Sequence, residues 1–166
     1  MTAGFTVRVA RDDELESAGD VVAEAYRPMP GMDEDPGYLE HVRDARGRAH
    51  EVDVLVAVGD DGAILGCASF VREHTSPYAE LERPDEAGIR MVGVAPGARG
   101  RGVARALVEA CAERARASGK RGIAILTEPR WTVSHAVYGR LGFRRAPDRD
   151  WEPEPGFWLW AWTLEL

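Results

Sequence analysis

The alternation of hydrophobic and polar residues predicts that the chain begins with a strand and a helix. Apolar residues occupy alternate positions of residues 5–10, as in a strand with one buried face. From Leu15 to Ala25 the apolar residues follow helical spacing instead, and Asp12 and Asp13 precede them as candidate N-caps. Residues 38–49 have a weaker helical pattern.

The next apolar segments predict a hairpin followed by a strand–helix–strand unit. Residues 52–58 and 63–72 read as strands joined by the turn Gly-Asp-Asp-Gly, which is typical of an antiparallel hairpin. Residues 86–94 read as a further strand, residues 102–118 as an amphipathic helix, and residues 122–127 as a nearly all-apolar strand. Such a unit normally joins two parallel strands by a crossover.

The C-terminal quarter adds a short helix at residues 133–141, a strand that starts at Phe143 and a last strand over residues 157–166. Three tryptophans and a leucine of the last strand share one face, where we expect core packing or a dimer contact rather than a substrate wall. They are Trp158, Trp160, Trp162 and Leu164. No repeat or linker divides the chain, so we expect one mixed α/β domain over residues 1–166.

Two loops are candidates for binding an amine, although solvated loops are the alternative. Residues 27–37 contain three prolines and two glycines, with Met29 and Met32 close to three consecutive acidic residues. Residues 74–85 contain His74, Tyr78 and several glutamates that can contact a substrate.

Composition narrows the class of protein. With 45% hydrophobic and 30% charged residues and no long apolar run, the chain is of the globular type, without membrane association. Residues 1–5 lack the pattern of a signal peptide, so we expect a cytoplasmic protein. A net charge of −7 argues against nucleic-acid binding and allows a cationic substrate. Cys67 and Cys111 have no metal-ligand spacing, so we expect buried free thiols and no metal.

Residues 89–104 carry the main candidate chemistry. An apolar strand there leads through a corner rich in glycine and arginine into a helix N-terminus, which offers unpaired N–H groups and a positive dipole end to a phosphate. A P-loop requires Lys and Ser or Thr after its last glycine, but Val103 and Ala104 follow Gly102. The dinucleotide fingerprint requires a small third residue, and that position holds Arg105.

The segment Arg-Gly-Arg-Gly-Val-Ala at residues 99–104 matches the signature Arg/Gln-x-x-Gly-x-Gly/Ala, and the sequence resembles the GNAT superfamily of acyl-CoA N-acyltransferases. Residues 89–96 resemble the fourth strand of that family, and residues 136–143 its tyrosine-bearing helix and the strand after it. The resemblance implies a central mixed sheet of about seven strands flanked by about four helices. It also implies an acetyl-CoA-dependent enzyme of EC 2.3.1 type.

The resemblance further implies which residues hold the co-substrate acetyl-CoA. The corner amides would bind the pyrophosphate, and the backbone of the fourth strand would pair with the pantetheine arm. These residues are Arg99, Gly100, Arg101, Gly102, Val103 and Ala104 at the corner, and Val92, Gly93 and Val94 on the strand. A bulge would part this strand from the next one, and Gly93 is compatible with one.

For catalysis, the resemblance implies that Tyr138 protonates the departing thiolate. Family enzymes often carry a glutamate on the fourth strand where this chain has Gly88; Glu86, two residues earlier, is the candidate base, with a water chain as the alternative. His135 is a weaker candidate.

The expected reaction is direct attack by a primary amine, from a small molecule or a peptide, on acetyl-CoA in a ternary complex; a homodimer is compatible with it. A non-catalytic acyl-CoA-binding sensor or interaction module stays open as an alternative, and so does a nucleotide-binding enzyme of another class.

Overall fold

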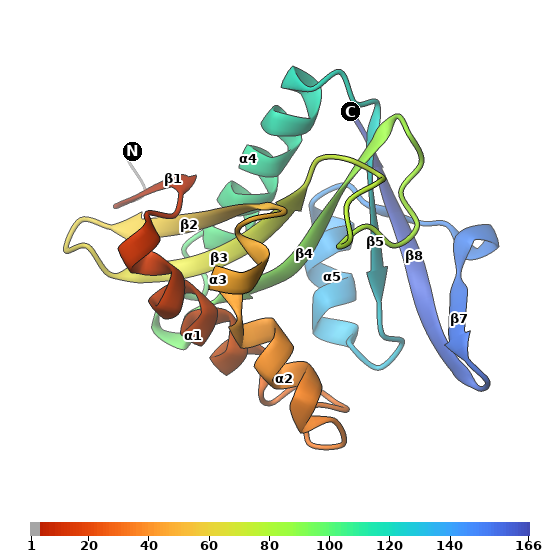
Figure 1. Ribbon diagram of the computed structural model, residues 1–166, viewed down its shortest axis with the longest axis horizontal. Coiled ribbons are helices and arrows are strands. Elements are labelled where there is room, and N and C mark those ends of the chain that lie inside the picture. The colour runs from red at the N-terminus through yellow and green to blue at the C-terminus, as the bar shows by residue number, and fades with distance from the viewer. Residues whose placement is uncertain (1–3) are drawn as a thin grey trace.

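The computed structural model describes residues 4–166, which form one eight-stranded sheet with helices on both faces (Figure 1). The strands are β1 (Phe5–Val9), β2 (Asp53–Gly59), β3 (Ile64–Val71), β4 (Glu86–Val94), β5 (Gly122–Thr127), β6 (Arg144–Arg145), β7 (Trp151–Glu154) and β8 (Phe157–Glu165). The α-helices are α1 (Leu15–Tyr26), α2 (Pro36–Arg43), α3 (Ala45–Arg48), α4 (Val103–Ala117) and α5 (Thr132–Arg140). Short 3₁₀ helices are η1 (Asp12–Glu14), η2 (Pro96–Ala98) and η3 (Pro147–Arg149).

The strand order is β1-β2-β3-β4-β5-β8-β6, with β7 paired to β8. The hairpin predicted from its Asp-Gly turn is confirmed by the antiparallel pairing of β2 with β3. The predicted crossover is confirmed as well, because β4 and β5 pair in parallel and α4 connects them. The mixed sheet that the sequence predicts is therefore present.

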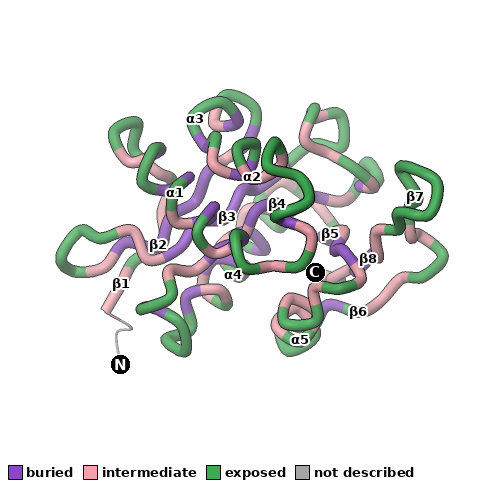
Figure 2. The backbone as a smooth tube through the Cα atoms, turned by 90° about the horizontal axis from the view of Figure 1, so that it is seen from below, coloured by how far each residue is buried: buried purple, intermediate pink, exposed green. Residues whose placement is uncertain are grey.

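Two hydrophobic cores lie on opposite faces of this sheet, as Figure 2 shows by the buried segments between the helices. Leu55 and Ala57 of β2 face α4, while Val54, Val56 and Val58 face α1 to α3. This alternation is the period-two pattern of a strand that is covered on both sides. One core therefore holds α4 and α5 to the sheet, and the other holds α1 to α3.

A β-bulge in β4 reverses this alternation partway along the strand. Cys67 of β3 pairs with Gly93, yet Ser69 pairs with Arg90, so two residues of β4 oppose one residue of β3. Met91 sits at the bulge with φ of 54°. Before the bulge the odd-numbered residues of β4 face the core beneath α4, and beyond it Val92 does so. Beyond the bulge, the positions of β4 that face each side of the sheet are therefore shifted by one residue, and Gly93 faces α1.

Several boundaries differ from those that the sequence predicts. The expected helix over residues 38–49 is divided at Asp44, whose ψ of 66° ends α2 and whose carboxylate caps α3 by accepting from Gly47 N–H. Neither Asp12 nor Asp13 caps α1; Glu14 instead accepts a hydrogen bond from the N–H of Arg11. The proline-rich link contains β7, so the sheet has eight strands rather than about seven.

Both cysteines are buried free thiols, as predicted. Burial raises the pKa of Cys67 to about 11 and that of Cys111 to about 12. None of the helices in residues 4–166 combines the length and the apolar character needed to cross a membrane.

The packing of α1 against the segment between α2 and α3 predicts a strong effect of one substitution. A Cβ at Gly19 would overlap the carbonyl oxygen of Arg43 and lie 3.0 Å from its carbon. We therefore expect Gly19→Ala to lower the free energy of unfolding by about 1–3 kcal/mol, because backbone must shift. Urea denaturation measures this. In the matched control Gly139→Ala, where no atom lies within 4 Å, we expect no loss of stability.

Candidate functional site

The two central parallel strands part shortly after they begin. β4 and β5 pair only over Glu86–Gly88 and Gly122–Ala124, and beyond these three pairs they diverge, with α5 beside the opening (Figure 1). Beyond Gly88, the edge of β4 that faces the opening pairs with no described strand. This stretch of backbone can pair with an extended ligand, in the way that a peptide adds to a sheet edge.

The corner after β4 presents a row of backbone N–H groups. The first paired amide of α4 is that of Ala106, which donates to the carbonyl of Gly102. The N–H groups of residues 100–105 have no partner within residues 4–166. Gly100 and Gly102 have φ of 79° and 81°, a region that residues with a side chain rarely adopt. The corner is therefore a helix N-terminus shaped for an anion.

One cleft of about 1020 Å³ connects this corner to the opening between the strands. Of the nine residues proposed for the co-substrate, the cleft is lined by Val92, Gly93, Val94, Arg99, Gly100, Gly102, Val103 and Ala104. The exception is Arg101, whose guanidinium lies close to Gly4 on the outer side. Only its backbone remains in the corner.

Tyr138 lies in the wall of the same cleft, on α5. Its ring packs edge-on against Phe143 with the ring centroids 5.3 Å apart. Burial raises the pKa of Tyr138 above its ordinary value, so the phenol keeps its proton at neutral pH. A neutral phenol beside a cleft is in the state that a proton donor requires.

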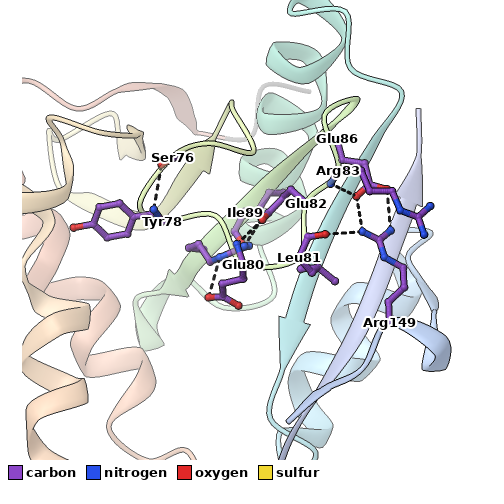
Figure 3. A network of polar contacts seen from close by, with 10 residues as sticks. Ser76, Tyr78, Glu80, Leu81, Glu82, Arg83, Glu86, Ile89 and Arg149 are labelled. Atoms are coloured by element: carbon purple, nitrogen blue, oxygen red, sulfur yellow. Dashed lines mark hydrogen bonds and ion pairs between the residues drawn. The ribbon is translucent and has the colours of Figure 1, made fainter. Parts of the chain in front are cut away.

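The structure places Glu86 outside this cleft. Both of its carboxylate oxygens accept hydrogen bonds from Arg149, each at 2.8 Å, and one also accepts from the N–H of Arg83 (Figure 3). These bonds lower the pKa of Glu86 against the opposing effect of burial. The hypothesis that Glu86 is the base thus receives no support from the geometry, because its carboxylate is fixed to the loop before β7.

A different carboxylate occupies the place beside Gly88. A Cβ at position 88 would collide with the Oε1 atom of Glu82, whose side chain is completely buried. Glu82 is paired with Arg90 and accepts a hydrogen bond of 2.6 Å from the N–H of Glu80 (Figure 3). Both Glu80 and Arg90 line the cleft. The missing side chain at position 88 is therefore replaced by one from the β3–β4 loop.

The two candidate amine loops contribute to the cleft in part. Pro28, Met29 and Pro30 line it, whereas Met32 is buried in the core under α1. Tyr78 and Glu80 line it from the second loop, but His74 does not. The tryptophans of β8 are absent from its lining, and Trp162 belongs to the core beneath α4, as expected.

His135 also lies outside the lining of the cleft. Its Nε2 is 2.9 Å from Thr127 Oγ1, and its ring stacks on Trp160 with centroids 5.3 Å apart. Burial lowers the pKa of His135, so the ring is neutral at neutral pH. These contacts fit a residue that joins α5 to β5 and β8.

Glu80 and Glu82 were predicted only as glutamates of the 74–85 loop that can contact a substrate, and Arg90 was not predicted as a site residue. One signal was present in the chain: Arg90 is the one charged residue among residues 87–94, and such a residue requires a partner. The identity of that partner depends on the path of a fourteen-residue loop between β3 and β4, which residue patterns do not determine.

An anion-binding corner, a bulged strand that parts from its neighbour and a tyrosine thus lie along one cleft. The model of the acetyltransferase (GNAT) family matches residues 19–143. The chain therefore belongs to that family, and membership supports an acyltransferase activity that depends on acetyl-CoA.

Solved structures agree with this assignment of fold. A GCN5-related N-acetyltransferase from Kribbella flavida is 25% identical, with a TM-score of 0.67 and complete coverage of both chains. The protein yncA from Salmonella typhimurium, solved with its cofactor acetyl-CoA, is 20% identical over 98% of this chain and 94% of its own, with a TM-score of 0.68.

PaiA N-acetyltransferase from Thermoplasma acidophilum, solved with coenzyme A, reaches a TM-score of 0.74 at 11% identity, over 98% of this chain and 99% of its own. A comparison with curated protein sequences finds no match.

The ion pair of Glu86 predicts a loss of stability that depends on pH. Glu86→Gln should lower the free energy of unfolding at pH 7 by about 1–3 kcal/mol, because the nearly buried Arg149 loses its charged partner. The folded-state pKa of Glu86 is depressed, so its contribution is complete above the unfolded pKa and declines as the pH falls through the folded pKa.

The free energy of unfolding, measured by denaturation at pH 7 and below pH ~4, compares the condition in which Glu86 contributes fully with the one in which its contribution declines. As control, Glu109→Gln removes a carboxylate that is 62% exposed and pairs with Arg105; we expect a change below about 0.5 kcal/mol. An equal loss for both variants would contradict a structural role of the Glu86 pair.

Proposed function

We propose that the protein transfers the acetyl group of acetyl-CoA to the primary amine of an acceptor, by direct attack while both substrates are bound. The observation that carries the proposal is the continuity of the cleft, which runs from the unpaired amides of residues 100–105 to Tyr138. The structural neighbours from Salmonella typhimurium and Thermoplasma acidophilum, solved with acetyl-CoA and with coenzyme A, support it.

In this proposal the corner binds the pyrophosphate of coenzyme A through the unpaired backbone N–H groups of residues 100–105. Arg99 and Arg105 line the cleft there and add positive charge to a molecule whose net charge is −7. The pantetheine arm lies along Val92 to Val94, where the strand has no neighbour on the side of the opening. Its amides would complete the hydrogen bonds that β5 leaves unmade.

The acyl transfer then needs little covalent help from the protein. Holding the amine in line with the thioester carbonyl supplies a large part of the rate. As the C–N bond forms and the C–S bond breaks, Tyr138 donates its proton to the departing sulfur. Its raised pKa keeps that proton in place until the thiolate appears.

Release of the coenzyme A thiol from acetyl-CoA tests the function directly. The panel consists of lysine, cadaverine, spermidine and a peptide with a free N-terminus, and the product is identified by mass. Thiol release that requires an amine supports the transferase. Binding of acetyl-CoA without release in any mixture supports the alternative, a sensor or interaction module.

Tyr138→Phe should lower kcat by roughly 10²-fold or more while leaving the affinity for acetyl-CoA unchanged, because only the proton is lost. Steady-state kinetics and titration calorimetry measure the two quantities. A variant with the turnover of the wild type would remove Tyr138 from the mechanism.

Gly100→Ala should weaken coenzyme A binding by about tenfold or more, since a side chain at this φ strains the backbone that presents the amides. The neighbouring Gly97→Ala is the control, because a Cβ added at Gly97 would meet no described atom within 4 Å and this glycine has no positive φ. Stabilisation by coenzyme A in thermal unfolding reports the affinity of both variants. Equal affinities would contradict binding at the corner.

A further inference from the structure

We propose that the carboxylate of Glu80, in the β3–β4 loop, accepts the proton of an alkylammonium acceptor, and that Glu82 and Arg90 hold it in position. This inference rests on the proposed function, because it supplies the proton acceptor that an amine acetyltransferase requires. An alkylamine is protonated at neutral pH and cannot attack until it loses a proton. Glu86 and His135 both lie outside the cleft, whereas Glu80 is a carboxylate in its lining and can take this role in place of a water chain.

The first step of the argument is the space at Gly88. This glycine lies on β4 between Val71 of β3 and Ala124 of β5, at the last pair before β4 and β5 part. The carboxylate of Glu82 fills the volume that a side chain at position 88 would need. A glycine at this point therefore leaves room for the β3–β4 loop to pack on the strand, and the same loop places Glu80 in the lining of the cleft. Figure 3 shows the side chains of Glu80 and Glu82 on this loop.

The second step is the distribution of charge around Arg90. Its side chain is 10% exposed and pairs with two carboxylates, Glu82, which is fully buried, and Glu80, which is 34% exposed. One guanidinium cannot neutralise two carboxylates. Since a charge with no exposure requires a close partner, Arg90 balances Glu82 first. Glu80 keeps a surplus negative charge on the side of the cleft.

The geometry of the second pair agrees with this division. Arg90 Nε lies 3.1 Å from Glu80 Oε1, yet this buried N–H donates no hydrogen bond to any described acceptor. The pair is thus held by charge and by the bond from Glu80 N–H to Glu82, and the carboxylate of Glu80 is not committed to a directed bond with Arg90. It has lone pairs available for an ammonium group.

The surroundings of Glu80 also favour proton uptake. Burial is the main cause that raises the pKa of Glu80, and Glu82 adds to it, while Arg90 opposes both. Tyr26 and Tyr38 line the same cleft, and burial raises the pKa of both, that of Tyr38 to about 12, so that both are neutral. The other titratable or charged side chains in this part of the lining are His41, Tyr78 and Arg130. A carboxylate with increased proton affinity is a better base toward an ammonium.

The proposed step balances. The ammonium gives one proton to Glu80, and the free amine forms a C–N bond to the thioester carbon as the C–S bond breaks. Tyr138 gives its proton to sulfur and recovers one from the new amide nitrogen. Glu80 releases its proton to solvent, so one proton leaves per turnover.

The acceptor class that fits is an alkylamine with a cationic nitrogen. The cleft beside Glu80 is lined by aromatic side chains, Tyr38 and His41 from α2 and Tyr78 from the same loop. Aromatic rings with one carboxylate attract a desolvated cation more than a neutral group.

The test measures kcat/KM against pH for the panel amine that the wild type uses best. Glu80→Gln should lower kcat/KM at pH 7 by about 10²- to 10⁴-fold, without a change in coenzyme A affinity or unfolding temperature. Asp85→Asn is the matched control in the same loop; this side chain is exposed and forms no bond or ion pair with described residues. It should retain the activity of the wild type.

A second substrate tests whether Glu80 acts as a base or only supports the structure. A fluorinated analogue of the same amine, whose ammonium pKa is low enough for it to be neutral at pH 7, needs no base for its first proton. Glu80→Gln should therefore lose at least tenfold less activity on the analogue. Equal losses on both amines would indicate general damage and would overturn the proposal.

Glu82→Gln tests the positioning role. Removing the buried negative neighbour should lower the pKa of Glu80, so the acid limb of kcat/KM should move to lower pH; an unmoved limb would contradict the role of Glu82.

A wild type that releases no thiol with any amine overturns the proposed function. An active wild type with an equally active Glu80→Gln variant overturns the role of Glu80 alone.

Discussion

The parting of β4 from β5 is the constraint on which the site depends. The two strands pair at three positions and then separate, while β4 keeps its antiparallel bonds to β3 on its other edge. The bulge at Met91 turns the strand by one residue at this point. As a result the chain enters the glycine corner beside the opening, and the unpaired amides of the corner continue the unpaired edge of the strand.

Local features of this arrangement could be predicted from the sequence, because local residues determine them. Gly100 and Gly102 allow the positive φ of the corner, and the apolar spacing from Val103 fixes the face of α4 that is buried. The position of the bulge was harder to predict from the sequence. Gly93 was compatible with one, but the structure has the bulge at Met91 and uses Gly93 for a different purpose, the close approach of Val22 on α1. A Cβ there would lie 2.9 Å from the Cα of that valine.

The acid–base groups could not be predicted to the same degree, because they depend on contacts between distant segments. Strand alternation placed Glu86 on the same face as Gly88, but it carries no information on Arg149, sixty-three residues later, which binds its carboxylate. The same limit applies to Glu82, since only the folded loop shows that its side chain fills the space above Gly88. Tyr138 could be proposed from the sequence because a contiguous segment, residues 136–143, resembles one segment of the family.

The charged groups of the cleft differ along its length. Arginines and free amides gather at the corner, where the anionic part of a donor would lie, and the surplus carboxylate lies beyond Arg90. Burial raises the pKa of both Tyr138 and Glu80, but from different ordinary values, so it has different effects at neutral pH. The phenol becomes harder to ionise and keeps its proton, whereas the carboxylate of Glu80 binds a proton more strongly than an exposed one does. In the proposed mechanism, one physical cause thus prepares both the proton donor and the proton acceptor.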